Sequence, residues 1–373
     1  MSNGGERPLT VLMTADTVGG VWAYSMELAS ALSARGVKVF LATMGPEVTK
    51  GQMDEAREVK GLEIFQGGFR LEWMEDPWES VAEAGEWLLG LEKSLSPDVV
   101  HLNGYCHGAL RWSAPVIIVA HSCVLSWWEA VKEGPAGGGW TRYGMEVEKG
   151  LRSAQAVIAP SYAMLESLKR THAFSAPAFV IYNGRSNESF RPGVKEDFIL
   201  TAGRLWDEAK NIRALERAAR SISWPVCAAG AYEHDQGSFI PDGAIRMLGR
   251  LSKTEMAEWM SRASIFALPA RYEPFGLTVL EAALSECALV LGDIPSLREL
   301  WDGAALFVEP GDAGRLAIAL EMLASDRALR ARLGMLARER AAEYAPERMA
   351  GAYHALYGRL SSAAEREGDA CAL

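Results

Sequence analysis

Short apolar runs alternate with longer amphipathic segments along almost the entire chain. An apolar run bounded by turn residues predicts a buried strand, and apolar residues that recur every three to four positions predict a helix. The strands predicted before residue 185 cover residues 9–16, 37–44, 97–104, 115–122, 154–161 and 178–184. A helix is predicted over residues 21–36, where Gly36 closes it. This regular alternation indicates parallel sheets that are covered by helices.

A polar, turn-rich segment at residues 185–197 interrupts the alternation and marks the best domain boundary in the chain. The strands predicted after it cover residues 198–205, 225–230, 244–248, 264–269, 288–292 and 305–308, and the helices between them include 211–222 and 253–263. From residue 312 the pattern is mostly helical, and we expect the polar segment 365–373 to be frayed.

The predicted fold class is α/β, with two Rossmann-like domains that face each other across a cleft. Residues 1–185 form the first domain in this interpretation, and residues 186–355 form the second. Residues 356–373 form the end of a C-terminal helix and a polar tail. In such folds a ligand binds where the carboxyl ends of the strands meet.

Composition narrows the possible partners and the compartment. The 373 residues carry a formal net charge of -10, and neither half is a basic platform for nucleic acid. Five scattered cysteines form no CxxC pair, which is typical of reduced thiols in a cytoplasmic protein. The N-terminal residues lack an apolar signal segment, and no apolar run is long enough to span a bilayer. A peripheral contact with a membrane stays open, as does the choice between a monomer and a homodimer.

A glycine pair follows the first predicted strand. Gly19 and Gly20 allow the backbone to approach a ligand closely, and the helix that begins after them favours negative charge at its N-terminus. The stretch is not a GxGxxG dinucleotide motif. A tight turn without a ligand explains this stretch equally well.

Two cations lie at the end of the strand that opens the second domain. Arg204 and Lys210 have the charge and the reach to hold a diphosphate. The alternative is that both are surface charges, paired with Asp207 and Glu208 between them.

Residues 271–286, "RYEPFGLTVLEAALSE", place Glu273 before a predicted helix and Glu281 inside it. Pro274 is expected near the first position of this helix, whose early amides, around residues 275–278, would be free to hold a phosphate or a sugar hydroxyl. The Glu273 carboxylate suits sugar hydroxyls, and that of Glu281 suits the vicinal hydroxyls of a ribose. Alternatively, Glu273 caps the helix and Glu281 lies on the surface, although the apolar neighbours of Glu281 disfavour a surface position.

Taken together, these motifs resemble glycosyltransferase family 4, a group of retaining enzymes of the GT-B fold that use nucleotide-diphosphate sugars. Glu273 and Glu281 match the E-x7-E pattern of that family, and "VIYNGRSNESFRP", "AGRL" with a following lysine and the N-terminal glycine pair match as well. The resemblance spans roughly residues 10–312.

The resemblance implies a role for each matching position. Arg204 and Lys210 would hold the donor diphosphate, Glu281 the ribose, and Glu273 the transferred sugar. The other positions implied to bind the donor are Gly19, Gly20, Gly249 near the base, Phe275, Gly276, Leu277 and Thr278. His121 would lie near the anomeric centre, although a lone histidine at a strand end is more often structural than catalytic. His101 and His107 are weaker candidates that either face the acceptor or pack.

Two further sequence patterns bear on where the acceptor binds and on whether the enzyme needs a metal ion. The family's first domain usually holds the acceptor, and Trp127 and Trp128 directly follow the His121 strand, where indole faces suit a sugar ring or an apolar aglycone. The glycine-rich residues 134–139 would form a mobile loop that closes over the acceptor. We expect no metal, because the chain has no D-x-D pattern and no cluster of His and Cys ligands.

The function implied is a retaining, metal-independent glycosyltransferase. It would move a sugar from a UDP- or GDP-linked donor to a saccharide, a lipid-linked or a small-molecule acceptor, with no further cofactor. The alternatives are a sugar-nucleotide epimerase or hydrolase of the same fold, and a non-catalytic protein that binds nucleotide sugars.

Overall fold

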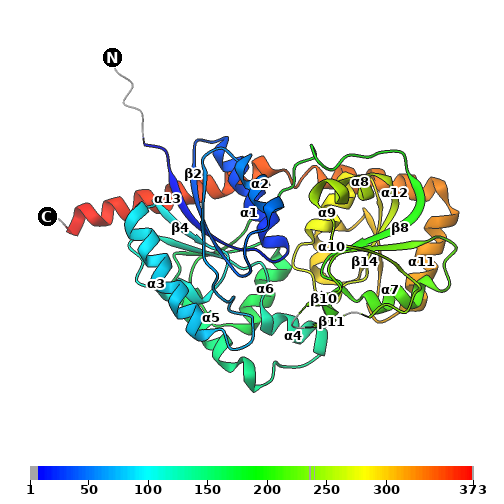
Figure 1. The fold of residues 1–373 in the computed structure, drawn as a ribbon, viewed down its shortest axis with the longest axis horizontal. Coiled ribbons are helices and arrows are strands. Elements are labelled where there is room, and N and C mark those ends of the chain that lie inside the picture. Colours follow the sequence, from blue (N-terminus) through cyan, green and yellow to red (C-terminus); the bar gives the residue numbers. More distant parts are fainter. Residues whose placement is uncertain (1–6, 235–236, 239, 372–373) are drawn as a thin grey trace, which may run out of the picture.

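The computed structural model describes residues 7–234, 237–238 and 240–371. Figure 1 shows two α/β domains side by side, each with helices around a central sheet. Both central sheets are parallel throughout, as the sequence pattern predicts.

The first sheet has seven strands in the order β3-β2-β1-β4-β5-β6-β7. Its strands are β1 Thr10–Asp16, β2 Lys38–Met44, β3 Leu62–Gln66, β4 Val99–Leu102, β5 Val116–Val119, β6 Ala156–Ala159 and β7 Ala178–Val180. The helices of this domain are α1 Gly20–Ser33, α2 Lys50–Arg57, α3 Trp78–Leu95, α4 Val124–Lys132, α5 Thr141–Ser153 and α6 Tyr162–Thr171, with short 3-10 turns η1 Cys106–Ala109 and η2 Gly138–Trp140.

The second sheet has six strands in the order β12-β9-β8-β13-β14-β15. Its strands are β8 Glu196–Ala202, β9 Val226–Ala229, β12 Arg246–Gly249, β13 Ala263–Leu268, β14 Ala288–Gly292 and β15 Ala305–Val308, and a separate antiparallel pair consists of β10 Glu233–His234 and β11 Gly237–Ser238. The helices that follow residue 196 are η3 Glu208–Lys210, α7 Ile212–Ala219, α8 Lys253–Arg262, α9 Leu277–Leu284, α10 Pro295–Trp301, α11 Ala313–Ser325, α12 Arg327–Ala341 and α13 Pro346–Cys371.

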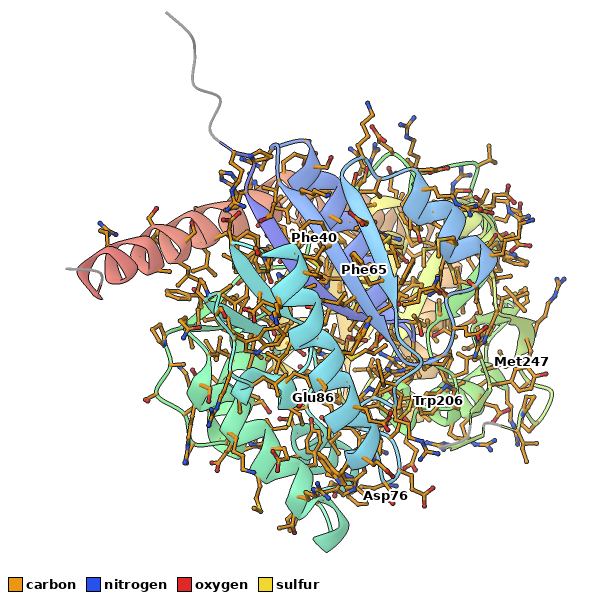
Figure 2. The ribbon with its side chains drawn as sticks, turned by 60° about the vertical axis from the view of Figure 1, so that its left-hand side comes forward. Phe40, Phe65, Asp76, Glu86, Trp206 and Met247 are labelled. Carbon is orange, nitrogen blue, oxygen red and sulfur yellow. The ribbon has the colours of Figure 1, made fainter. Side chains whose placement is uncertain are left out.

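The sequence pattern missed strand β3 at the edge of the first sheet. Its side chains are half-buried or exposed, so the run is less apolar than that of a central strand. Phe65 of β3 packs its ring against Phe40 of β2, with ring centroids 6.4 Å apart (Figure 2). This ring contact helps to hold β3 on the sheet, although the alternation of apolar and amphipathic segments in the sequence does not reveal the strand.

The prediction that Pro274 opens a helix is wrong. Helix α9 begins at Leu277, and Gly276 before it has a φ of +87°, a left-handed conformation that a helical residue cannot adopt. Pro274 lies outside the helix, where its carbonyl accepts a hydrogen bond of 2.7 Å from the Ser161 hydroxyl of the first domain. The turn before α9 is therefore tied to the first domain.

Helix α13 returns from the second domain to the first, as Figure 1 shows. Met349, Tyr353 and Tyr357 are buried in the same core as helix α1. The sequence-based division assigned residues up to 355 to the second domain, whereas the buried face of α13 lies in the first. Of the segment 365–373 that we expected to be frayed, the part up to Cys371 continues as helix, and the last two residues lie outside the described part of the chain.

Within the described residues, none of the helices has the combination of length and apolar character that crossing a membrane requires. Cys106, Cys123, Cys227 and Cys287 are free thiols in the interior.

Candidate active site

The glycine turn after β1 meets the second domain. A Cβ atom added at Gly19 would lie 3.7 Å from the Arg204 guanidinium, and one added at Gly20 would lie 3.7 Å from Leu277. Gly19 also has a φ of +81°, which favours glycine. The carboxyl end of β1, the loop after β8 and the start of α9 therefore converge at one place between the domains.

The two predicted diphosphate ligands are paired with carboxylates in this structure. Arg204 bonds to Asp207 at 3.0 Å, and Lys210 forms an ion pair with Glu273. The Lys210 and Glu273 side chains are only 13% and 12% exposed. Burial alone would raise the pKa of Asp207, but Arg204, Lys210 and the hydrogen bonds that the carboxylate accepts together hold it below its usual value. The site thus contains two cations whose carboxylate partners an anionic ligand could replace.

The turn that opens α9 offers unpaired backbone donors. Among the described residues, no acceptor bonds to the amides of Phe275, Gly276, Leu277 and Thr278. The amides that follow these four are bonded, because the Gly276 carbonyl accepts hydrogen bonds of 3.0 Å from the amides of Val279 and Leu280. Free amides at a helix N-terminus form an anion-binding site, and here Lys210 and Glu273 lie beside them.

Gly276 makes this turn possible, and its replacement is expected to be costly. A Cβ atom there would lie 3.1 Å from Val279 Cγ2 and 3.3 Å from Glu273 Cγ. We expect Gly276→Ala to lower the free energy of unfolding by roughly 1–2 kcal/mol, the cost of a left-handed alanine, and to weaken donor binding because Glu273 must shift.

Gly303→Ala is the matched control, because Gly303 has a φ of +79° with no atom within 4 Å of the added Cβ. Chemical unfolding and nucleotide-sugar titration measure the two effects. Equal donor affinity in both variants would contradict a role of this turn in binding.

Glu281 lies in a buried ion network that joins the domains. Arg185 bonds to Glu281 at 2.8 Å and to Glu27 of α1 at 3.0 Å. The Arg185 and Glu281 side chains are 5% and 8% exposed, so Glu281 is not a surface residue. Burial raises the pKa of Glu281, and Arg185 offsets part of that rise.

His121 lies just after β5, against the ring of Tyr24 and beside Asn103. The ring centroids of His121 and Tyr24 are 4.4 Å apart, and His121 Nε2 lies 2.8 Å from Asn103 Oδ1. Burial of the imidazole lowers its pKa to about 3, so the ring is neutral at physiological pH. A group with that pKa is a poor general base near neutral pH.

The two weaker histidine candidates pack in the interior. His101 has no exposed surface and lies behind Asn103, and His107 Nε2 bonds to the Val81 carbonyl at 3.0 Å. Both side chains are buried and bonded to groups of the first domain, which fits the packing alternative.

The two tryptophans expected near the acceptor lie on α4, against the second domain. Trp127 donates a hydrogen bond of 3.0 Å to Asp207, and Trp128 packs edge to face against Trp127 at 5.9 Å. The glycine-rich loop beside them borders a cavity of about 890 Å³. That cavity is lined by residues of α4, α5, the end of α6 and the loop, including Leu125, Trp140 and His172.

Gly249 ends the edge strand β12 with a φ of +71°, and its carbonyl accepts a bond of 2.8 Å from the Gly230 amide. The position predicted to lie near the base is thus a turn at the carboxyl end of β12, next to β9.

Sequence reasoning did not single out Asp16, Asn103 or Arg185. Asp16 ends β1, where burial raises its pKa to about 7 although Arg204 opposes that rise. Asp16 and Asn103 both lie at carboxyl ends of strands, a signal that could have identified them. Arg185 directly follows the predicted strand 178–184, but the observed strand β7 already ends at Val180.

Comparison with known families decides the classification of the chain. The model of Glycosyltransferase Family 4 matches residues 18–188, and that of Glycosyl transferases group 1 matches residues 196–326. The chain belongs to glycosyltransferase family 4. The two matches meet at the predicted boundary, so each domain of this glycosyltransferase is recognised separately.

The glycosyltransferase is similar along most of its length to several named proteins. A glycogen synthase of Mycobacterium tuberculosis is 28% identical, and the match covers 87% of this chain and 86% of that protein. The structure of sucrose-phosphate synthase from Thermosynechococcus elongatus superimposes with a TM-score of 0.81 at 20% identity, and the match covers 95% of this chain and all of that chain. Anabaena HepE in complex with UDP-glucose gives a TM-score of 0.74 at 16% identity, covering 94% and 100% of the two chains. The predicted GT-B fold is thus confirmed.

Proposed function

We propose that this glycosyltransferase moves a sugar from a nucleotide-diphosphate donor to a saccharide, lipid-linked or small-molecule acceptor. Transfer retains the anomeric configuration and needs neither a metal ion nor a further cofactor. The observation that carries the proposal is the convergence of the Gly19–Gly20 turn, Arg204, Lys210 and the free amides before α9.

The diphosphate binds where these groups meet. Its oxygens replace Glu273 on Lys210 and Asp207 on Arg204, and the amides of Gly20 and of residues 276–278 complete the site. Glu273, released from Lys210, accepts hydrogen bonds from the hydroxyls of the transferred sugar. Glu281 has one oxygen on Arg185, and its second oxygen takes the ribose hydroxyls. Gly249 lies near the base.

Retention follows from where the leaving charge is held. Arg204, Lys210 and the amides are fixed in place before the reaction, which is where electrostatic stabilisation is most effective. As the bond from the anomeric carbon to the diphosphate oxygen breaks, a phosphate oxygen on the same face accepts the proton of the acceptor hydroxyl. That hydroxyl oxygen then forms the new bond to the anomeric carbon on the face that the diphosphate leaves. His121, neutral at physiological pH, positions the sugar and does not act as the base.

The acceptor lies on the side of the first domain, near Trp127 and Trp128. The cavity beside the glycine-rich loop belongs to the same domain and has apolar walls from Leu125 and Trp140, although neither Trp127 nor Trp128 lines it. The buried free thiols support a cytoplasmic location for the reaction. The match with HepE in complex with UDP-glucose supports testing UDP-linked donors first and GDP-linked donors second.

A panel of UDP, GDP, ADP and their sugars, read by the shift in melting temperature, tests the donor. A ligand that binds the folded state stabilises it in proportion to the logarithm of its concentration over Kd. Free sugar or an epimer formed from the donor alone would favour the alternative, an epimerase or hydrolase. Binding of a donor without any chemistry, across a panel of acceptors, would favour the non-catalytic alternative.

We expect the reaction to proceed in excess EDTA and the product to keep the configuration of the donor. Cations and amides of the protein neutralise the leaving diphosphate, so chelation removes nothing that the reaction needs. NMR of the first-formed product reads the configuration. Inversion, or loss of activity in EDTA that Mn²⁺ restores, would rule out this mechanism.

A further inference from the structure

The side chain of Asn103, just after β4, connects two histidines. Its Nδ2 lies 2.7 Å from the Thr14 carbonyl oxygen, and a carbonyl can only accept a hydrogen bond, so this end of the amide is the nitrogen. The oxygen, Oδ1, therefore faces the histidines. It lies 2.8 Å from His121 Nε2 and 3.1 Å from His101 Nε2.

These contacts fix which nitrogen of each imidazole carries the proton. An amide oxygen only accepts, so Nε2 of both rings must donate. Burial lowers the pKa of His101 and of His121 to about 3, so each ring is neutral and has a single N–H. Nδ1 is consequently unprotonated in both rings, and both nitrogens at that position are acceptors.

The two acceptor nitrogens have different surroundings. His101 Nδ1 accepts a hydrogen bond of 2.6 Å from the hydroxyl of Tyr357, which α13 brings into the first domain. No group in the described part of the chain bonds to His121 Nδ1. One ring is thus saturated inside the core, and the other keeps a free acceptor.

We propose that Asn103 is a positioning residue that fixes the Nε2–H tautomer of His121, and that His121 Nδ1 thereby serves as the acceptor for a hydroxyl of the transferred sugar. The assignment of the tautomer follows from the contacts above, whereas the bond from a sugar hydroxyl to Nδ1 depends on the proposed function. A sugar that lacks this hydroxyl leaves Nδ1 without a partner, so His121 selects for a hydroxyl donor at that place.

Among the described residues, no charged group bonds to His121 or shifts its pKa, so none sets the tautomer instead. The groups that face the ring are Tyr24 from α1, Asn103, and His101 behind it on β4. Burial raises the pKa of Tyr24 well above its usual value, so its hydroxyl stays neutral. A neutral amide therefore determines the proton position.

The first test is spectroscopic and needs no substrate. Long-range ¹H–¹⁵N spectra of the full-length, ¹⁵N-histidine-labelled protein at pH 7 distinguish the two tautomers and the imidazolium, and His121→Gln assigns the signal. We expect the Nε2–H tautomer for His121. The Nδ1–H tautomer or an imidazolium would overturn the proposal.

The second test changes the group that faces the histidines. In Asn103→Asp a carboxylate replaces the amide oxygen, which is expected to raise the pKa of His121 and to protonate Nδ1 near neutral pH. We expect the affinity for the nucleotide sugar to fall about tenfold, roughly the value of one hydrogen bond, while the affinity for the nucleoside diphosphate stays unchanged. Unchanged spectra together with unchanged affinity for the sugar nucleotide would overturn the proposal.

Tyr357→Phe is the matched control, because it removes the partner of His101 Nδ1 and leaves Asn103 in place. We expect the His121 signal and the sugar affinity to stay as in the unmodified protein. A change of the His121 tautomer in this control would overturn the assignment to Asn103. If no nucleotide sugar binds but the Nε2–H tautomer is observed, the proposed function and the sugar hydroxyl fail while the role of Asn103 in fixing the tautomer stands.

Discussion

Replacing Lys210 with alanine is expected to lower kcat/KM for sugar transfer by about a hundredfold or more. Removal of one fixed donor to a developing charge commonly costs about 10²–10³ in rate. The same change leaves Glu273 without its cation, although the Glu273 side chain is only 12% exposed. Steady-state kinetics with a saturating acceptor measures the loss, and a thermal melt shows whether the variant is folded.

Lys38→Ala is the control for this experiment. Lys38 also has a carboxylate partner, Glu63 of edge strand β3, at 3.1 Å, but these two side chains are 44% and 51% exposed. Exposed ion pairs contribute about 0–1 kcal/mol to stability, and Lys38 begins β2, whereas the candidate site lies at the carboxyl ends of β1 and β8. Unchanged kinetics in Lys210→Ala, or an equal loss in the control, would contradict a phosphate-binding role for Lys210.

The largest effect on stability is expected from Arg185→Met. This change leaves the carboxylates of Glu27 and Glu281 buried without a cation, and breaking such a buried network costs about 3–5 kcal/mol. Urea unfolding at pH 8 measures the loss. Arg298→Met is the control, because Arg298 pairs with Asp293 and Asp302 while 45% exposed, and we expect it to lose less than about 1 kcal/mol.

The loss in Arg185→Met is expected to depend on pH. Burial already raises the pKa of Glu281, and removing Arg185 raises it further because the opposing charge is gone. A carboxyl whose pKa is higher in the folded state than in the unfolded state destabilises the fold above the folded-state pKa. That penalty disappears below the unfolded-state pKa. The deficit relative to the unmodified protein should therefore be largest at pH 8 and shrink as the pH falls; a deficit that grows towards acid pH would contradict this account.

The sequence predicts those parts of the molecule that are determined by residues close together along the chain. Buried strands, the glycine turn after β1 and the E-x7-E spacing are local patterns, and the structure places Gly19 beside Arg204 and Lys210 beside Glu273. Edge strand β3 is missing from the prediction because half-exposed strands have a weak apolar signal.

Contacts between distant residues could not be predicted in this way. Arg185 reads as part of a polar linker, yet it lies buried between Glu27 and Glu281, which come from different domains. Asn103 reads as a strand end, and its importance depends on two histidines and on Thr14. No pattern of polar and apolar residues encodes which distant side chains a linker or a turn will meet.

The return of α13 to the first domain has a consequence for biosynthesis. Tyr353 and Tyr357 have no exposed surface and complete the core around α1, but the ribosome adds them only after all the strands and the other helices of the second domain. Domains usually fold in the order in which they are translated. Here the domain that begins first is the one that is completed last, so its partly formed core must stay soluble while the rest of the chain is made.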